Sequence, residues 1–547
     1  MSAASRFPAK RPDRRPEVIE ADGDSGNLTG PIFLKDEAAT NQLGEDIAMV
    51  LRPGDMLCLR GDLGAGKTTL ARAVIRKLAN DSQLEVPSPT YTLCQTYDST
   101  PKITHLDFYR ISEPEEIHEL GFEELLETGV SIIEWPERAS GLLPDDAVWI
   151  SLDIVEGNSR QAVISHRESE RSDDVSRQNN GLLNRISRSL SIRKFLDEEW
   201  TPGARRSFLV GDASTRRYEI VDHDRQRRIL MDSPRQPDGP PVREGLPYSQ
   251  IAHLAEDVIP FIGVGETLLK AGLAAPVIHG RRNADGLLLI EHLGNEKIIT
   301  DESAAIPSRY LEAARLVALL HKQGWTDEIQ VVDEIGAITE YRISRYDEQA
   351  LKVEVSLFLD WYVPEFSRSE LDEKQIEAFH EIWNDLIAAL ENSTQTLVLR
   401  DYHSPNIIWR ESEPFPRNIG LIDFQDAVIG PQAYDLASLA QDARVDISSS
   451  LEERIINVYL EMRADEPDFN VNEFQRDFAI LGAQRATKIL GIFVRLNKRD
   501  GKPDYLKHLP RMRDYLGRNL GHPILSDYRE WCSTVLDQDL VSKDLLQ

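Results

Sequence analysis

The sequence predicts an α/β domain with a mainly parallel sheet, joined by a polar linker to a larger α+β domain with two lobes. The first prediction depends on a glycine-rich segment between an apolar strand and a helix within residues 55–78, followed by further strand and helix patterns. The second depends on hairpin-like alternation after residue 206, which gives way to long helical patterns after residue 308. At 547 residues, the chain is also too long for one ordinary domain.

Changes in composition set the expected boundaries. The N-terminal residues are basic and proline-rich without the apolar stretch of a secretory signal, so we expect a disordered tail over 1–27. Residues 167–190 begin with a polar run that has no usable apolar face, and they predict a linker. The expected domains are therefore 28–166 and 191–547, the second with its lobe boundary near 290–295.

The overall composition excludes several classes of protein. The net charge of −29, from 63 basic and 92 acidic residues, argues against a general nucleic-acid-binding surface. The three cysteines, Cys58, Cys94 and Cys532, form neither a metal motif nor a disulfide framework, which indicates a reducing compartment. No apolar run reaches the length of a membrane span. We therefore expect a cytoplasmic protein that does not bind membranes.

The first domain is expected to alternate strands and helices around the glycine-rich segment. Helical spacing predicts helices over 36–51 and 69–78, and an acidic amphipathic helix over 113–127. Short apolar runs predict strands over 55–60, 103–108, 131–135 and 147–154. This order is typical of a parallel sheet covered by helices.

Residues 61–70 read GDLGAGKTTL and fit the phosphate-binding pattern G-x-x-x-x-G-K-[ST]. Small residues at Gly61 and Gly66 let backbone N–H groups turn inward around phosphate oxygens. Lys67 can reach the β- and γ-phosphates, and the Thr68 hydroxyl can bind Mg²⁺. A chance glycine-rich turn is the alternative, but the flanking strand and helix stand in the order that a P-loop requires.

Two carboxylates follow expected strands of this domain. A site for Mg²⁺ and nucleotide needs one acidic residue to hold the metal through water and another to position a nucleophilic water. Asp107 and Glu134 are the candidates, against the alternative that they are surface carboxylates. We expect Trp135 to form a wall of the site and His105 to pack without a chemical role.

These segments resemble the TsaE family, the P-loop ATPases of the bacterial threonylcarbamoyladenosine tRNA-modification machinery. The motifs GDLGAGKTTLAR, SPTYTL, HLDFYR and IEWPER occur in the family's order within residues 28–166. The resemblance implies a P-loop NTPase fold with ATP and Mg²⁺ as cofactors. It also implies that nucleotide is cradled by Asp62, Leu63, Gly64, Ala65, Gly66, Lys67, Thr68 and Thr69.

The same resemblance implies roles for residues outside the loop. Thr68 and Glu134 would bind Mg²⁺, Asp107 would have a catalytic or switch role, and the loop 88–92 would sense nucleotide. Glu37 would lie near the adenine. Family members work when docked on the TsaD–TsaB pair, so tRNA would be involved only through that complex. The rival interpretation is a free-standing NTPase that needs no partner.

A second chemical centre lies in the C-terminal half. Residues 399–409 read LRDYHSPNIIW, and residues 420–426 read GLIDFQD. An aspartate with an asparagine five positions later, then a second aspartate after an apolar strand, is the plan of a kinase catalytic loop. Asp401 would accept the proton of the attacking hydroxyl, and Asn406 and Asp423 would hold Mg²⁺. We expect Asp435 to brace this loop.

This region resembles the aminoglycoside-phosphotransferase branch of the kinase-like fold from about residue 191 to 528. The resemblance implies a phosphate-covering hairpin at 211–218 and an adenine-binding hinge at 290–293, where Glu291 and Leu293 would contribute backbone groups. One departure is clear, because the family's strand lysine should lie near 230–232, where this sequence reads LMD. Arg216 or Arg217 could supply the phosphate grip instead.

The motifs GDASTRRY, LMDSP and RDYHSPNIIW resemble a subfamily, the AmgK amino-sugar kinases. Its members also lack the lysine, and they phosphorylate the anomeric hydroxyl of N-acetylmuramate and N-acetylglucosamine in cell-wall recycling. The resemblance therefore implies a bifunctional fusion of an ATPase and a sugar kinase. Two alternatives remain for the C-terminal half: a phosphotransferase for aminoglycosides or other small molecules, and a non-catalytic binding module. A protein kinase is disfavoured because no Ala-Pro-Glu pattern follows Asp423.

Overall fold

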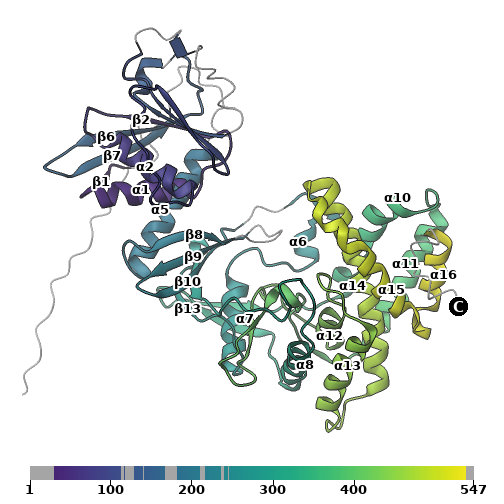
Figure 1. Cartoon of the computed structure of the whole chain (residues 1–547). Coiled ribbons are helices and arrows are strands. Elements are labelled where there is room, and N and C mark those ends of the chain that lie inside the picture. Colours follow the sequence, from purple (N-terminus) through teal and green to yellow (C-terminus); the bar gives the residue numbers. More distant parts are fainter. Residues whose placement is uncertain are drawn as a thin grey trace, which may run out of the picture. The chain divides into compact units, whose positions relative to one another are not determined.

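The computed structural model describes residues 30–111, 116–117, 129–139, 141–166, 181–209, 216–235, 239–243 and 245–536. The chain divides into two compact units, Met1–Lys194 and Phe195–Gln547 (Figure 1). The expected tail, most of the expected helix over 113–127, the first part of the expected linker and residues 211–215 of the expected hairpin lie outside the described residues.

The first unit is built on a seven-stranded sheet in the order β1-β7-β6-β2-β5-β4-β3. The four central strands are parallel, because β2 pairs with β5 and β6 and β4 pairs with β5 in parallel register. The two edges are antiparallel, through β7 and β1 on one side and β3 on the other. The predicted α/β domain is thus confirmed, with a parallel centre. The strands are β1 (Ile32–Leu34), β2 (Met56–Arg60), β3 (Cys94–Tyr97), β4 (Lys102–Asp107), β5 (Gly129–Glu134), β6 (Val148–Ile154) and β7 (Arg160–His166).

Two helices place the glycine-rich loop. Helix α1 (Glu37–Ala48) is capped by Asp36, whose carboxylate accepts the Ala39 N–H at 2.9 Å. Helix α2 (Lys67–Leu78) begins directly after the loop, two residues earlier than expected. The two helices pack together through Leu43, Ile47 and Leu70, which are buried in the core of this unit. Since β2 is a central strand, the loop lies at the middle of the sheet's carboxyl edge.

Helix α5 (Gly181–Glu199) occupies the last part of the expected linker, which was predicted to extend over 167–190. The helix begins at Gly181, and its residues Leu182, Leu183 and Ile186 belong to the core of the first unit. Residues 181–190 therefore form part of a packed helix, and the expected domain start at 191 lies inside that helix. The polar run that suggested a linker ends before the apolar face of α5 begins.

The second unit opens with a five-stranded antiparallel sheet in the order β13-β14-β10-β9-β8. The predicted hairpin-like alternation after residue 206 is confirmed, because β9 and β10 pair from His223 and Gln226 to Arg217 and Asp232. Helix α7 (Ile259–Lys270) is apolar along most of its length and belongs to the core of this unit. The strands are β8 (Arg205–Leu209), β9 (Arg217–His223), β10 (Gln226–Asp232), β13 (Ile278–Arg282) and β14 (Leu287–Glu291).

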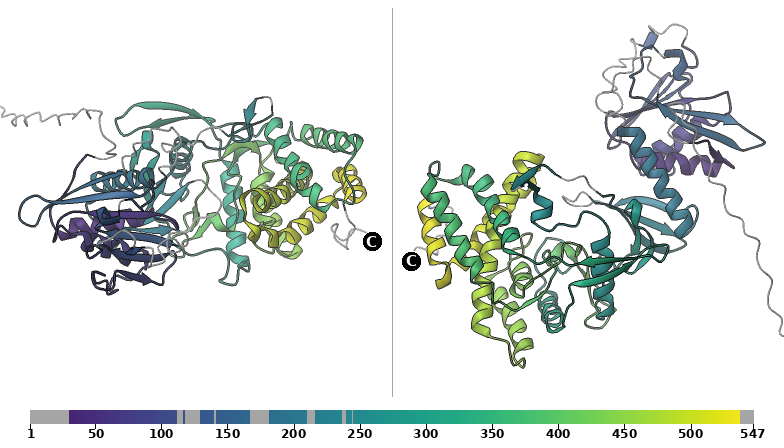
Figure 2. Two further views of the ribbon diagram at one scale, coloured as in Figure 1. Left: turned by 90° about the horizontal axis from the view of Figure 1, so that it is seen from above. Right: turned by 180° about the vertical axis from the view of Figure 1, so that it is seen from behind.

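The rest of the second unit is mainly helical, as predicted (Figure 2). Two short antiparallel ladders within it, β17–β20 and β18–β19, frame the sequence motifs of the second centre. The strands are β17 (Gln395–Val398), β18 (Ile407–Trp409), β19 (Ile419–Leu421) and β20 (Val428–Pro431). The helices are α8 (Pro307–Lys322), α9 (Glu348–Leu357), α10 (Val363–Phe366), α11 (Glu373–Ala388), α12 (Ala433–Ala440), α13 (Ser449–Arg463), α14 (Val471–Asp500), α15 (Leu509–Leu520) and α16 (Ser526–Val535).

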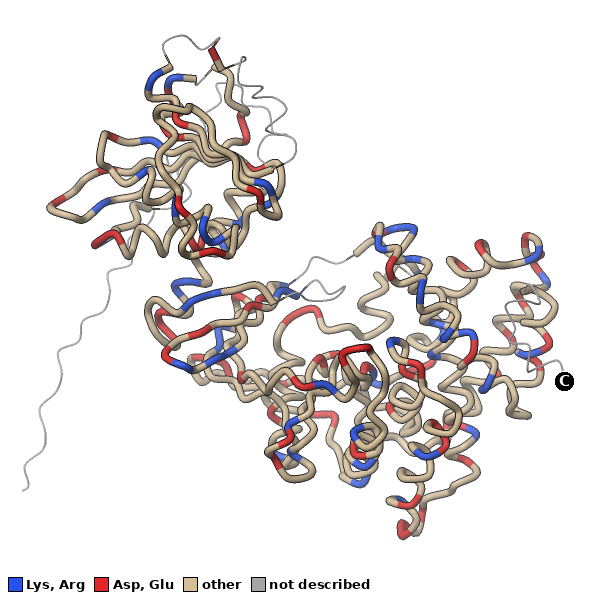
Figure 3. Tube along the Cα trace, viewed as in Figure 1, with Lys and Arg blue, Asp and Glu red and all other residues tan. Residues whose placement is uncertain are grey.

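Smaller elements also belong to the second unit, among them the hairpin of β15 (Glu328–Val332) and β16 (Ile338–Arg342). The hairpin β11 (Pro241–Arg243) and β12 (Leu246–Pro247) leads into the short helix α6 (Tyr248–Ile251). A π-helical segment, η4 (Phe358–Tyr362), joins α9 to α10. In the part of the chain that the structure describes, no helix is long and apolar enough to cross a bilayer. Basic and acidic residues are interspersed along the described parts of both units (Figure 3).

Candidate functional sites

The glycines of the first site are required by backbone conformation and close packing. Gly61 has φ of +141°, and a Cβ there would lie 2.3 Å from the Leu152 carbonyl oxygen. Gly64 and Gly66 also have positive φ values, of +78° and +105°. These are conformations that only glycine adopts at little cost. The loop therefore turns tightly from β2 into the N-terminus of α2, and the N-terminus of a helix favours a bound anion.

Lys67 is folded back over this loop. Its ammonium group donates to the carbonyl oxygens of Gly61 at 2.7 Å and Asp62 at 3.0 Å, and it lies 3.9 Å from the centroid of the Trp135 ring. Burial lowers the pKa of Lys67, while nearby carboxylates, Glu134 first among them, oppose that shift. The expected wall position of Trp135 agrees with this geometry.

The carboxylates of the two motif strands lie beside the loop. Asp107 and Glu134 are paired in register at the ends of the neighbouring parallel strands β4 and β5. The Thr68 hydroxyl donates to Glu134 Oε2 at 2.9 Å, so the two predicted Mg²⁺ ligands are in contact. A hydroxyl and a carboxylate are oxygen donors of the kind that Mg²⁺ binds, so these residues fit the ion that the family implies.

Asp107 is held by the loop that was expected to sense nucleotide. Its Oδ2 accepts from the Ser88 hydroxyl at 2.9 Å and from the Thr90 hydroxyl at 2.7 Å. Its Oδ1 accepts the backbone N–H of Tyr109 at 2.9 Å. A change in the loop 88–92 would therefore alter the position of this carboxylate directly.

His105 was expected to pack without a chemical role, and this expectation is incomplete. The ring is fully buried, and its Nε2 lies 3.1 Å from Glu134 Oε1. Glu134 is thus held through one oxygen by Thr68 and through the other by His105. The alternation of His105 and Asp107 on one face of β4 was the available signal, because residues two apart in a strand share a face.

We expect His105→Ala to lower ATP hydrolysis by the first unit about tenfold and to raise the Mg²⁺ concentration needed for half-maximal rate. The physical reason is that Glu134 loses the partner that fixes one of its oxygens. A Mg²⁺ titration of the steady-state rate measures both effects. Thr96→Ala, at an exposed position in neighbouring β3, is the control. An unchanged Mg²⁺ dependence in folded His105→Ala protein would contradict the positioning role.

Two further residues, Arg160 and Glu37, lie near the glycine-rich loop. Arg160, which sequence reasoning missed, donates to the carbonyl oxygens of Ala65 and Gly64, both at 3.1 Å, and so braces the loop from β7. Glu37 is the exposed first residue of α1. That helix end approaches the loop, because Thr40 lies next to Gly66, but a position of Glu37 near adenine stays a prediction.

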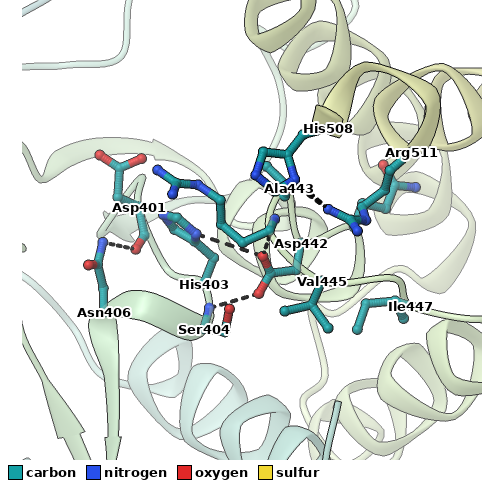
Figure 4. Close-up of polar contacts among 12 residues, drawn as sticks. Asp401, His403, Ser404, Asn406, Asp442, Ala443, Val445, Ile447, His508 and Arg511 are labelled. Carbon is teal, nitrogen blue, oxygen red and sulfur yellow. Dashed lines mark hydrogen bonds and ion pairs between the residues drawn. The ribbon is translucent and has the colours of Figure 1, made fainter. Parts of the chain in front are cut away.

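In the second unit, the three predicted kinase-type residues come together. The Asn406 side-chain amide donates to the Asp401 carbonyl oxygen at 2.9 Å and to Asp423 Oδ2 at 3.3 Å. Figure 4 shows Asp401 and Asn406 at the two sides of one tight loop. Asp423 has φ of +59°, and its Oδ1 accepts from Gln425 at 2.7 Å. Burial and then the nearby Asp401 raise the pKa of Asp423, which is typical of carboxylates gathered for a cation.

Two buried carboxylates brace this loop from the helical side. Asp435 accepts the backbone N–H groups of Leu399 at 2.7 Å and Arg400 at 3.0 Å, in agreement with its expected bracing role. Burial raises the pKa of Asp435 to about 7. Asp442 accepts the Ser404 N–H at 2.8 Å and lies 3.8 Å from His403 Nδ1 (Figure 4). His403 therefore contributes to loop structure.

The strand that should carry the phosphate-gripping lysine is β10. Its residues Leu230, Met231 and Asp232 are buried, and they contain no lysine. Of the two candidate replacements, Arg216 lies closer to the centre. Its guanidinium is 3.9 Å from Asp423 Oδ1 and 3.6 Å from Asp426 Oδ1, whereas Arg217 is exposed on β9.

The expected hinge lies at the end of β14. Glu291 donates its backbone N–H to the Val277 carbonyl oxygen at 2.8 Å, and its carboxylate lies 3.5 Å from Arg410. This N–H is therefore already used within the sheet edge. Leu293 is buried and packs over Gly420, at the start of the Asp423 motif. Contact of these residues with adenine stays a prediction.

Comparison with known proteins finds a different family in each of the two units. The family described as threonylcarbamoyl adenosine biosynthesis protein TsaE matches residues 34–162, and the phosphotransferase enzyme family matches residues 206–469. The tRNA threonylcarbamoyladenosine biosynthesis protein TsaE of Rickettsia felis is 39% identical over 142 residues, which are 26% of this chain and 82% of that protein. The N-acetylmuramate/N-acetylglucosamine kinase of Caulobacter vibrioides is 33% identical over 357 residues, 62% of this chain and 93% of that protein. The chain belongs to both families.

Among solved structures, a microcompartment-associated aminopropanol kinase is 15% identical with a TM-score of 0.40, over 62% of this chain and 98% of that one. By the matched residues, the TsaE-family domain carries the P-loop centre, and the amino-sugar-kinase-family domain carries the centre of Asp401, Asn406 and Asp423. Both predicted family resemblances are confirmed, and the chain is a fusion of the two.

The amino-sugar-kinase-family domain also contains a large cavity of about 1600 Å³ next to this centre. Arg216 and Asp426, which lie beside Asp423, line one part of it. Other walls come from the β11–β12 hairpin, α6, η4 and α14. Its lining includes four arginines and four carboxylates: Arg216, Arg243, Arg495, Arg499, Glu256, Asp360, Glu370 and Asp426. The charged groups are balanced, so this cavity is not an acidic one.

Proposed function

We propose that the chain carries two independent ATP-dependent activities. The TsaE-family domain hydrolyses ATP in support of threonylcarbamoyladenosine modification of tRNA. The second domain transfers a phosphoryl group from ATP to the anomeric hydroxyl of N-acetylmuramate or N-acetylglucosamine. The observation that supports this most directly is that each unit brings its own group of candidate nucleotide-site and metal-site residues together.

In the second domain, Asp401 would accept the proton of the attacking hydroxyl. The anomeric oxygen then bonds to the γ-phosphorus, the bond from that phosphorus to the β–γ bridging oxygen breaks, and ADP leaves. Asn406 and Asp423 would hold Mg²⁺, and their amide and carboxylate oxygens suit that ion. When bound, Mg²⁺ neutralises charge on the phosphates.

Arg216 is proposed to supply the phosphate grip that the missing lysine supplies elsewhere. We expect Arg216→Ala to raise the KM for ATP of the sugar kinase about tenfold, because a charged hydrogen bond to phosphate is lost. Arg217→Ala is the matched control, since this neighbouring arginine is exposed and we expect no more than a twofold change. Equal effects of the two substitutions on this KM would contradict the assignment.

An amino-sugar acceptor is favoured over an aminoglycoside by the charge of the cavity. Aminoglycosides are polycations, and a site for them needs an excess of carboxylates. The cavity lining is balanced and contains four arginines. The intact Asp401, Asn406 and Asp423 constellation argues against a binding module without catalysis, because binding alone does not need a base and two metal ligands.

The first domain is proposed to act with TsaD-like and TsaB-like subunits in the cytoplasm, and to meet tRNA only through that complex. Its position in the TsaE family supports this proposal. The rival, a free-standing NTPase, predicts a full rate without partners. An ATPase rate that rises on adding the two subunits supports the proposal, and a rate that does not respond to them contradicts it.

The kinase proposal is tested by ADP release from purified Lys67→Ala protein, in which the first site is silenced. We expect release that depends on N-acetylmuramate or N-acetylglucosamine and stops when Asp401→Ala is added. Phosphorus NMR of the product identifies the phosphorylated hydroxyl. Release with an aminoglycoside and with neither sugar would replace the proposed substrate. No release with any acceptor would favour the binding module.

A further inference from the structure

Arg495 on α14 is a cation in the wall of the large cavity and forms no ion pair with a described carboxylate. Among the described residues, no carboxylate oxygen lies within 4.0 Å of its guanidinium, and its buried Nε–H reaches no hydrogen-bond acceptor. Its guanidinium carbon lies 5.3 Å from the centroid of the Tyr248 ring on α6. Helices α6 and α14 lie side by side in Figure 1, and the arginine bridges them.

The unsatisfied Nε–H of Arg495 has a free-energy cost when the cavity holds no ligand. Burying an arginine N–H without an acceptor costs free energy, and the cost is larger than for a buried N–H of a neutral group. Burial also lowers the pKa of Arg495, the sign of a guanidinium whose surroundings supply little compensation. An anion in the cavity would satisfy the unpaired donor, and the nearby Tyr248 ring favours a cation at this position.

A second arginine of the same helix provides a contrast. Arg499 lies one turn further along α14 and also lines the cavity. It is bound by Asp500 through two hydrogen bonds, of 2.8 Å and 3.0 Å. Arg499 therefore has a carboxylate at hydrogen-bond distance, whereas the same Asp500 acts on Arg495 only at longer range, which leaves the Arg495 Nε–H to a ligand.

The position of Arg495 relates it to the reaction. The cavity that it lines is also lined by Arg216 and Asp426, which lie beside the candidate metal ligand Asp423. Small-molecule sites commonly have volumes of about 300–1,000 Å³, so this cavity of about 1600 Å³ has room for a sugar at the phosphate end and a substituent beyond it. N-acetylmuramate differs from N-acetylglucosamine by a lactyl ether that ends in a carboxylate.

We propose that Arg495 is a specificity residue that binds the carboxylate of an anionic acceptor sugar in this cavity. This inference rests on the proposed kinase function and adds the chemical class of the preferred substrate. The site accepts neutral amino sugars, but a carboxylate on the ring substituent strengthens binding. Arg495 acts on acceptor binding, and the transfer step itself is left to Asp401.

The test compares three acceptors in the Lys67→Ala background: N-acetylmuramate, its neutral amide, and N-acetylglucosamine. We expect the wild-type second domain to have the lowest KM for N-acetylmuramate. Arg495→Gln should raise that KM about tenfold, with kcat and both neutral acceptors changed less than twofold. Arg495→Lys should keep part of the preference, and Arg499→Gln should leave it intact.

The possible failures are distinguishable. An equal loss with all three acceptors in Arg495→Gln would show a structural role and overturn the proposal. Equal KM values for N-acetylmuramate and its amide in the unchanged domain would overturn it too, while the kinase function stands. Absence of ADP release with all three acceptors would overturn both the proposal and the kinase function on which it rests.

Discussion

Lys67→Ala is expected to lower ATP hydrolysis by the first unit at least about 100-fold and to leave sugar phosphorylation unchanged. Lys67 is the cation buried in the glycine-rich loop, within 3.0 Å of two loop carbonyl oxygens. In the nucleotide complex, its ammonium group would move to the β- and γ-phosphates, where charge develops during hydrolysis. Phosphate release without sugar, measured with the TsaD-like and TsaB-like subunits present, reports this activity.

The control for this experiment is Lys35→Ala, which removes an exposed lysine that lies outside the loop. We expect its hydrolysis rate to match that of the unchanged protein. The second readout is sugar-dependent ADP release from the same preparations. If folded Lys67→Ala protein lost both activities, the two centres would not be independent, and the bifunctional proposal would need a shared nucleotide site.

Asp401→Asn is expected to lower the kcat of sugar phosphorylation about 1,000-fold and to spare ATP hydrolysis by the first unit. An amide cannot accept the proton of the attacking hydroxyl. The substitution leaves the loop in place, because Asn406 donates to the backbone carbonyl oxygen of Asp401 and not to its side chain. The change therefore isolates the proton transfer from the shape of the site.

The KM for ATP and a control variant show whether the effect is specific to proton transfer. The KM for ATP in Asp401→Asn should stay within about threefold of the unchanged value, because the metal and phosphate residues are intact. Asp385→Asn, an exposed position on α11, is the control for the loss of one acidic group. A kcat within tenfold of that of the unchanged enzyme would show that Asp401 is not the base. The carboxylates near it, Asp423 first, would then be the candidates for that role.

The sequence could predict the two centres because their key contacts follow from local spacing or from neighbouring strands. Thr68 and Glu134 meet because β2 and β5 are adjacent parallel strands, and carboxyl ends of parallel strands share one edge. Asp401 and Asn406 meet because only a short turn separates them. Contacts of this kind do not depend on how distant segments of the chain pack.

Other parts of the sites depend on packing between segments whose pairing the sequence does not encode. Arg160 reaches Ala65 across a separation of 95 residues, and it does so because β7 turns back antiparallel beside β6. His105 needed the register of β4 on β5 before its contact with Glu134 could be recognised. Arg495 is one of many arginines, and only the fold distinguishes an unpaired one in a cavity wall from a solvated one.

Helix α5 has a practical consequence for anyone who wishes to express the two activities separately. Its first turns supply Leu182, Leu183 and Ile186 to the first unit, where Arg193 also pairs with Asp46 at 2.8 Å. Its last residues serve the second unit, where Glu198 pairs with Arg282 at 2.6 Å. A gene divided at residue 190 would strip Arg193 from the first product, and one divided after 199 would strip Glu198 from the second. Two coding sequences that both include the codons for 181–199, so that each product carries its own copy of the helix, keep both cores whole.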